Sequence, residues 1–390
     1  MMSFKMDIAT KLLFGSGQLN NLHQEELPGK KALIVISNGT SAKKYGYLEK
    51  TEEQLKKAGA ETVLFDQIEA NPLKSTVMAG ARMAADNNCD FVVALGGGSS
   101  MDAAKSIALM AVNEGDYWDY IPGGTGKGKE VKNTPLPVIA ITTTAGTGSE
   151  IDRGTVITNS ETNEKIGFIH PDLLPEIAVV DPELMTTVPP KYTAFQGFDA
   201  LFHSIEGYLS KFTNKMSDMY AITAVKNIAE GLPKAVENGD NLKAREKVAF
   251  ANTLSGLVME VGALTSQHSL EHAMSAFHQE LPHGSGLIML SRAYFGKMIE
   301  RGAAEERFID LAKALGKDDA ERAEDFLTAL EQLQQKCGVT ELKMSNYGIK
   351  EDEFEAMAEN ARETMGELFQ CDRSELSLED TVDIYQKAYK

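Results

Sequence analysis

Cysteine is scarce in this 390-residue chain, which has three: Cys89, Cys337 and Cys371. They lie far apart and match neither a metal-binding nor a redox spacing. This excludes a disulfide framework and argues against a closed thiolate metal site. We expect buried or incidental thiols in a reducing cytoplasm.

Basic residues are also few: 39 Lys and Arg stand against 57 Asp and Glu, for a net charge of -18. Nucleic acids and anionic membranes need a basic face, so neither is an expected partner. The first residues contain no apolar run of the signal-peptide type, and nowhere do about 18 apolar residues follow one another. We expect a soluble, cytoplasmic protein.

The N-terminal half alternates apolar runs with helical spacing. At 43% hydrophobic residues and this length, two ordinary globular domains are expected. Continuous apolar runs predict strands buried on both faces, and their alternation with helices predicts a parallel sheet covered on both sides. The expected strands are KALIVIS from Lys31, TVLFDQI to Ile68, FVVAL from Phe91 and PVIAI from Pro137, of which FVVAL and PVIAI are the ones expected to be buried.

The second half has a different pattern. Shorter strand-like pieces end with IAVVD at Asp181, and Pro189-Pro190 then breaks the chain. From Tyr192 onward the spacing is helical. We therefore predict an α/β domain at residues 1–188 and an all-helical domain at residues 189–390. The charged stretch from Lys313 to Glu324 is expected to be a solvated helix surface.

Two loops rich in Gly, Ser and Thr follow two of the predicted strands. Gly96-Gly97-Gly98-Ser99 comes after FVVAL, and residues 142–150, TTTAGTGSE, come after PVIAI. The first is not a G-x-G-x-x-G fingerprint, so a plain strand-to-helix turn is the alternative. Two such loops at the carboxyl ends of parallel strands, with a helix start behind the first, predict a dinucleotide site.

Five of the seven histidines lie between residues 203 and 283. Asp199 and His203 are four apart, as are His268 and His272, so each pair shares a helix face. His283 follows Pro282. One such pair alone is more often a surface or capping pair, but two within one segment predict a divalent-metal site. Nitrogen and oxygen ligands suit iron, zinc, nickel or copper.

Four motifs together resemble the iron-dependent (group III) alcohol dehydrogenases, over nearly the whole chain. They are GGGSSMDAAK (96–105), TTAGTGSE (143–150), GFDALFHSIEGY (197–208) and HSLEHAMSAF with PHGSG (268–286). The resemblance implies a Rossmann-like nucleotide-binding α/β domain and an all-α metal-binding domain, together a dehydroquinate synthase-like fold. It also implies a homodimer or larger assembly.

The resemblance further implies roles for individual residues. The metal ligands would be Asp199, His203, His268 and His283. His272 would lie near substrate and nicotinamide without binding the metal, as a candidate proton relay. The gap from His268 to His283 is about one residue longer than in the family, which leaves His278 as an alternative ligand. This is a minority interpretation, and an exposed histidine at a helix end is the favoured one. The residues expected to face the nucleotide are Asp102, Thr143, Thr147 and Lys165, with the Gly96–Ser99 loop around the pyrophosphate.

Cofactor preference depends on the end of the first predicted strand. NAD-using relatives often place an Asp there, which repels a 2′-phosphate. This chain has Ser37-Asn38-Gly39-Thr40-Ser41, with Lys43 and Lys44 behind and no acid until Glu49. The loop is similar to that of NADPH-dependent aldehyde reductases in the family. We therefore favour NADP(H) over NAD(H).

The expected chemistry is hydride transfer between small alcohols and aldehydes or ketones and nicotinamide, with a metal as Lewis acid. Three imidazoles and one carboxylate would leave a net positive site. Iron(II) is favoured, with zinc or nickel as alternatives. The alternatives in function are a glycerol dehydrogenase-like polyol oxidoreductase, a dehydroquinate-synthase-like lyase and a non-catalytic metal-binding protein. The sequence does not define the substrate.

Overall fold

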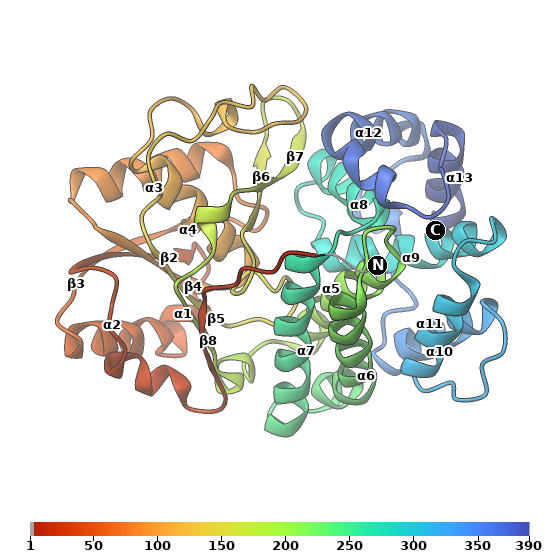
Figure 1. The fold of residues 1–390 in the computed structure, drawn as a ribbon, viewed down its shortest axis with the longest axis horizontal. Helices are drawn as coiled ribbons and strands as arrows, with labels where there is room; N and C mark the ends of the chain where they lie inside the picture. Colours follow the sequence, from red (N-terminus) through yellow and green to blue (C-terminus); the bar gives the residue numbers. More distant parts are fainter. Residues whose placement is uncertain (1–3, 390) are drawn as a thin grey trace. The chain divides into compact units, whose positions relative to one another are not determined.

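The structure, a computed structural model, describes residues 4–389. The chain divides into two compact units (Figure 1). The first comprises residues 7–144 and 148–187 and is called the sheet unit. The second comprises residues 145–147 and everything from Val188 onward, with a few N-terminal residues, and is called the helical unit. Whether residues 1–188 and 189–390 are separate domains stays a prediction.

A six-stranded parallel sheet forms the centre of the sheet unit, in the order β1-β8-β5-β4-β2-β3. Every neighbouring pair is parallel. This confirms the predicted α/β fold. The strands are β1 (Lys11–Phe14), β2 (Lys31–Ser37), β3 (Glu61–Ile68), β4 (Phe91–Gly96), β5 (Val138–Thr142) and β8 (Ile177–Val180).

Both faces of this sheet are covered, which is why its inner strands are continuously apolar. On β2, Leu33 and Val35 belong to one core, whereas Ala32, Ile34 and Ile36 belong to the other. This is the two-residue alternation of a strand. Helices α3 (Lys74–Asp86) and α4 (Gly98–Met110) contribute to the first core, and η1 (Gln18–Gln24) and α2 (Tyr47–Lys57) to the second.

Strand β1 was not predicted, because its four residues KLLF carry too short a pattern. It pairs with β8 at one edge of the sheet, 166 positions away at Lys11↔Ile177. Two of the shorter strand-like pieces form a separate antiparallel pair, β6 (Gly154–Asn159) and β7 (Glu164–Ile169). The remaining short elements are α1 (Ser41–Lys44), η2 (Tyr117–Asp119), η3 (Pro171–Leu173) and η4 (Pro182–Met185).

The helical unit contains no strand within its described residues, as predicted. The expectation of a helix surface from Lys313 to Glu324 was wrong, because α10 ends at Ala314 and α11 begins at Glu324. The helical unit contains α5 (Pro190–Leu209), α6 (Lys215–Glu237), α7 (Leu242–Val261), α8 (Ser266–Phe277), α9 (His283–Glu300), α10 (Glu305–Ala314), α11 (Glu324–Lys336), η5 (Met344–Tyr347), η6 (Glu351–Glu353), α12 (Phe354–Cys371) and α13 (Leu378–Ala388).

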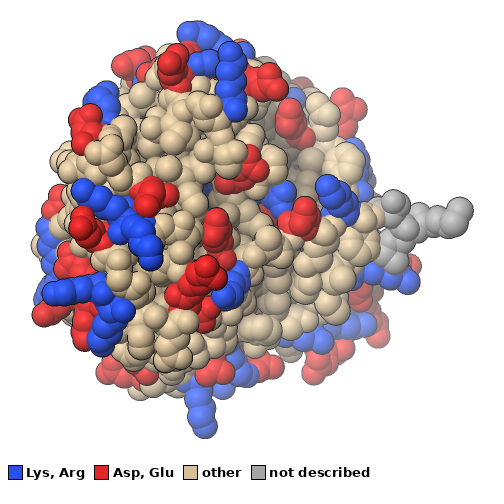
Figure 2. Space-filling model, turned by 60° about the vertical axis from the view of Figure 1, so that its left-hand side comes forward, with Lys and Arg blue, Asp and Glu red and all other residues tan. Residues whose placement is uncertain are grey.

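The surface carries charges of both signs. Figure 2 shows acidic and basic side chains interspersed over the face in view. Within residues 4–389, no single helix has the length and apolar character needed to cross a membrane. Helices α7 and α8 meet those criteria only when taken together, and they are bent by 107° relative to each other.

Candidate metal centre and nucleotide loops

Three helices of the helical unit bring the predicted metal ligands together. Asp199 and His203 lie one turn apart in the middle of α5, and both are buried. His268 is buried in the first turn of α8. His283 is the first residue of α9, directly after Pro282, whose fixed φ suits a helix start.

Asp199, His268 and His283 each present one ligand atom, and these atoms all lie within 4.8 Å of one another. Asp199 Oδ1 is 3.7 Å from His268 Nε2 and 3.5 Å from His283 Nε2. His203 is not part of that group of three. His203 lies next to this group of three. Its Nδ1 is 3.5 Å from Asp199 Oδ1, and its ring stacks on the His268 ring with 4.3 Å between the ring centroids.

Two buried atoms of this cluster lack a hydrogen-bond partner among the described residues. Among the described residues, Asp199 Oδ1 and His268 Nε2 are buried and accept or donate no hydrogen bond. Buried polar groups in native proteins are normally satisfied, so a pair of orphans facing each other calls for a ligand. A carboxylate oxygen and imidazole nitrogens are the donors that a divalent transition metal prefers. The residues therefore fit a metal ion.

The electrostatics of the cluster favour an ionised Asp199 beside neutral His203. Burial raises the pKa of Asp199, but the adjacent imidazoles of His203 and His283 hold it well below its usual range. Burial lowers the pKa of His203 to about 3, against the attraction of Asp199. At His268, burial lowers the pKa but the charges of Glu206 and Asp199 outweigh it and raise the pKa to about 10, so a metal ion must displace a proton from this ring.

Two buried glutamates support this cluster, and the sequence analysis missed both. Glu206 Oε1 lies 2.5 Å from His268 Nδ1, and Glu271 Oε2 is in close contact with His283 Nδ1. Both carboxylates are fully buried. A signal was available, because each glutamate lies three residues after a predicted ligand, His203 or His268, and so one helical turn on.

His272 and His278 have different environments. His272 Nδ1 lies 2.8 Å from Met365 Sδ, at the point where α12 leaves helical geometry. His272 also forms a second compact group with Glu271 and His283. By contrast, His278 caps the end of α8 and its Nε2 lies 3.1 Å from Glu353 Oε2. His278 belongs to neither compact group of metal-ligating side chains found among the described residues.

The predicted nucleotide loops lie at one edge of the sheet unit. Strands β2, β4 and β5 are parallel neighbours, so their carboxyl ends share that edge. Helix α4 starts at Gly98, directly after β4. A Cβ added to Gly97 would lie 2.9 Å from the side chain of Thr144 in the second loop, so only glycine fits. This close cradle beside a helix N-terminus fits a pyrophosphate.

The loop of Ser37-Asn38-Gly39-Thr40-Ser41 follows β2 at the same edge, and Ser41 begins α1. The structure adds an acid to this region that the sequence reading did not consider. Lys43 Nζ is paired with Asp66 Oδ2 of β3 at 2.5 Å, and this contact lowers the pKa of Asp66. Lys43 is therefore already engaged by a carboxylate.

The other residues predicted to contact the nucleotide differ in hydrogen bonding, in burial and in the unit to which they belong. Asp102 accepts hydrogen bonds from Ser149 Oγ at 2.7 Å and Val156 N at 2.9 Å, and burial raises its pKa to about 6. Lys165 is buried on β7. Thr143 belongs to the sheet unit, whereas Thr147 belongs to the helical unit. Their contacts with a nucleotide stay predictions.

Comparison with known proteins gives the family. The family described as "Iron-containing alcohol dehydrogenase" matches residues 9–182. The family described as "Fe-containing alcohol dehydrogenase family, C-terminal" matches residues 193–389. Together the two matches span most of the chain.

Individual relatives agree. A 1,3-propanediol dehydrogenase of Klebsiella pneumoniae is 36% identical over 342 residues, 86% of each chain. An NAD-dependent methanol dehydrogenase of Bacillus methanolicus is 35% identical over 368 residues, covering 93% of this chain and 92% of that one. The crystal structure of an archaeal halo-thermophilic alcohol dehydrogenase from a Red Sea brine pool superposes with a TM-score of 0.94 at 34% identity, over 100% of this chain and 99% of that one. The chain therefore belongs to the iron-containing alcohol dehydrogenase family, whose members are oxidoreductases of alcohols and aldehydes.

Proposed function

We propose that this chain interconverts small alcohols and the corresponding aldehydes or ketones, using a divalent metal held by Asp199, His203, His268 and His283. The observation that carries the proposal is the convergence of buried Asp199 Oδ1 and His268 Nε2, which have no hydrogen-bond partner among the described residues. Iron(II) is the metal we expect, with zinc or nickel as competitors for the same nitrogen and oxygen donors.

When bound, the metal supplies Lewis-acid chemistry and the nicotinamide supplies hydride-transfer chemistry. The protein binds and orients both. Asp199 and the histidines hold the ion, and the backbone N–H groups of Gly97, Gly98 and Ser99 at the start of α4 are proposed to bind the pyrophosphate. Burial of the ligand cluster keeps water away from most of it.

His272 is proposed to relay the substrate proton. It is buried one helical turn from His268 and lies beside Glu271 and His283. Since it is not a proposed ligand, His272→Ala should retain the metal but turn over more slowly, with an altered pH dependence of kcat. Unchanged kcat and an unchanged pH profile would contradict the relay role.

The cofactor preference is a finer proposal. The loop Ser37–Ser41 with Lys44 behind it supports NADP(H), while the Lys43–Asp66 pair and the NAD-dependent relative count against it. Asp66→Asn frees Lys43, so this variant should raise kcat/KM for NADPH relative to NADH. Comparable kcat/KM for both cofactors in the unsubstituted protein would contradict a preference for NADP(H).

The names of the relatives support small primary alcohols as the substrate class. Their names include 1,3-propanediol, methanol and butanol, all small primary alcohols. The 36% identity to a 1,3-propanediol dehydrogenase makes a polyol oxidoreductase the second candidate. We also propose a homodimer or larger homo-oligomer, which light scattering coupled to gel filtration would test.

The deciding experiment is anaerobic oxidation of NADPH with butanal, comparing chelated protein with the same sample given ferrous iron. Restored activity would support the dehydrogenase and the catalytic metal together. Activity that survives thorough chelation would separate the metal from the chemistry. No oxidation of NADPH or NADH by iron-loaded protein, with butanal or 3-hydroxypropanal, would overturn the proposal.

A further inference from the structure

Each imidazole of the metal cluster has an oxygen acceptor at Nδ1. His268 faces Glu206, His283 faces Glu271, and His203 Nδ1 lies 3.2 Å from the carbonyl oxygen of Gly146. A neutral imidazole carries one N–H, so an acceptor at Nδ1 fixes the proton there. In His268 and His283 the Nε2 lone pair is then the one available to an ion, and these Nε2 atoms are the ones that approach Asp199 Oδ1.

We propose that Glu206 and Glu271 are positioning residues of the metal centre, a role that rests on the proposed function of that centre. Each carboxylate orients one ligand ring through Nδ1 and places a negative charge behind it. Neither glutamate is a proposed metal ligand. Together they decide how tightly the centre holds a divalent cation.

Glu206 is itself held in place from behind. Its second oxygen, Oε2, accepts hydrogen bonds from the backbone N–H of Thr265 at 3.1 Å and from Thr265 Oγ1 at 3.0 Å. Thr265 is the N-cap of α8, and His268 lies in the first turn of that helix. One carboxylate on α5 therefore fixes both the start of α8 and the ring that α8 carries.

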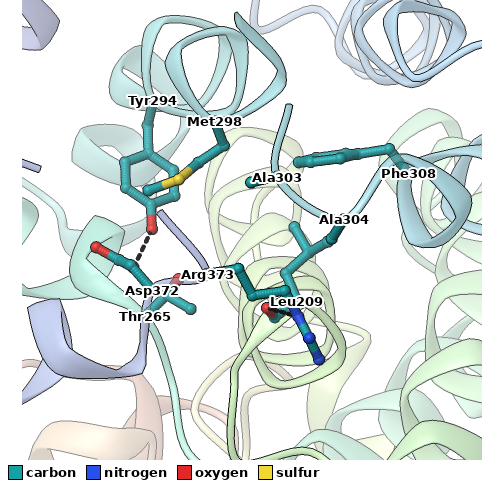
Figure 3. A pocket seen from close by; sticks show the side chains of 9 residues that line it. All are labelled: Leu209, Thr265, Tyr294, Met298, Ala303, Ala304, Phe308, Asp372 and Arg373. Carbon is teal, nitrogen blue, oxygen red and sulfur yellow. Dashed lines mark hydrogen bonds between the residues drawn. The ribbon is translucent and has the colours of Figure 1, made fainter. Parts of the chain in front are cut away.

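A second carboxylate, that of Asp372, binds the N-terminus of α8. Asp372 accepts hydrogen bonds from Ser266 N and from Ser266 Oγ at 2.6 Å. It also accepts one from Tyr294 OH at 2.7 Å (Figure 3). Thr265, Tyr294 and Asp372 line a small, partly open pocket on this side of α8, together with Leu209, Met298, Ala303, Ala304, Phe308 and Arg373. Two anions at a helix N-terminus also interact favourably with its dipole.

Glu271 is held by close packing between α8 and α9. A Cβ added to Gly286 of α9 would lie 2.7 Å from Glu271 Cγ and 2.9 Å from Oε1. The glycine three residues after His283 therefore leaves the space in which the glutamate side chain lies. Because Glu271 is fully buried, its carboxylate cannot turn to solvent instead of to His283.

These two glutamates change the charge of the centre. Counting Asp199 alone, a divalent ion leaves the site net positive, as expected from the sequence. With Glu206 and Glu271 included, three buried carboxylates outweigh one divalent ion. Buried charges are costly unless they are paired, so these carboxylates favour a divalent cation at the centre.

The test measures metal binding directly, without turnover. Glu206→Gln and Glu271→Gln keep shape and an acceptor oxygen but remove the charge. Glu353→Gln is the matched control, because Glu353 contacts His278 at 3.1 Å in the same unit but outside the cluster. Purified metal-free proteins are titrated with Co²⁺ against a competing chelator, and the visible Co²⁺ spectrum is recorded.

Roughly 10- to 100-fold weaker Co²⁺ binding is expected for each of the two cluster variants, with an altered Co²⁺ spectrum. The control variant should match the wild type. Circular dichroism of the metal-free variants distinguishes weaker Co²⁺ binding from a general loss of structure. Folded variants with Kd within twofold of wild type and an unchanged spectrum would overturn the proposal, even if their Tm had fallen.

A measurement on the wild-type chain covers the case in which neither glutamine variant folds. In zinc-loaded protein with ¹⁵N-labelled histidine, the rings of His268 and His283 should be metal-bound through Nε2 and protonated at Nδ1, with strongly downfield protons. Coordination of either ring through Nδ1 would overturn the proposal. Failure of the wild type to bind any divalent ion would instead overturn the proposed function.

Discussion

A buried ammonium group ties the glycine-rich helix α4 to the second loop of the sheet unit. Lys105 Nζ donates hydrogen bonds to Ser149 Oγ, Asp152 O, Asp152 Oδ1 and Gly154 O, at 2.8 to 3.0 Å. Its side chain is wholly buried. The sequence shows Lys105 only as the end of the GGGSSMDAAK run, and gives it no role.

Lys105→Met should destabilise the sheet unit by roughly 3–5 kcal/mol, because it leaves the carboxylates of Asp152 and Asp102 buried without their cation. Denaturant titration measures this loss. Lys57→Met is the control, since Lys57 forms an exposed pair with Glu53, and exposed pairs contribute little to stability. Equal losses of unfolding free energy in the two variants would show that the buried network stabilises the protein no more than an exposed ion pair does.

His203 is the proposed ligand that lies outside the compact group of three. His203→Ala should abolish metal retention, because its imidazole lies against both Asp199 and His268. Elemental analysis of protein dialysed against dilute chelator gives the metal content. His278→Ala should retain wild-type metal. A wild-type content in His203→Ala would remove His203 from the ligand set.

At the scale of elements, the start of α8 depends on Asp372. Burial raises the pKa of this carboxyl to about 6, with Glu206 adding to the effect and hydrogen bonds from Ser266 and Tyr294 opposing it. In the unfolded chain the pKa returns to about 3.8. Between these values the folded state binds a proton that the unfolded state has released, so this group's contribution to stability falls as pH rises from about 4 to about 6.

Asp372→Asn should remove that slope. The difference in unfolding free energy between wild type and variant should change by roughly 3 kcal/mol between pH 4 and pH 7, in favour of wild type at the acidic end. Denaturant titrations at several pH values measure it. Asp319→Asn, at an exposed position, serves as control. Parallel profiles for wild type and Asp372→Asn would contradict the raised pKa.

At the scale of the whole molecule, metal and fold are coupled through one unit. All four proposed ligands and both supporting glutamates belong to the helical unit. An ion that binds only the folded state stabilises it by about 2.7 kcal/mol at a free concentration 100 times its Kd. The sheet unit contributes no ligand to this set.

Removing the metal should therefore lower the unfolding temperature of the helical unit and leave that of the sheet unit unchanged. Calorimetry of chelated and metal-loaded protein would show this as two transitions, of which one moves. Two transitions would also support separate domains at residues 1–188 and 189–390. A metal-dependent shift of both together would mean that the chain unfolds as one cooperative unit.

The sequence by itself determined the features that depend on local spacing. Apolar runs predicted β2, β4, β5 and β8, because strands buried on both faces need no polar residues. β3, an edge strand with polar residues, was also predicted. Four-residue spacing placed Asp199 beside His203, since a helix returns to the same face after about one turn. Four motifs in order gave the family. Each of these signals is contained in a short stretch of the chain.

Tertiary structure alone decided the contacts between distant segments. Glu206 contacts His268, which lies 62 positions further along the chain, and Asp66 of β3 contacts Lys43 of α1. The four residues of β1 become a strand through pairing with β8. Such contacts depend on which helices and strands pack together, and no periodicity in one sequence encodes that. The sequence analysis counted only the carboxylate of Asp199, because Glu206 and Glu271 reach rings that are carried by other helices.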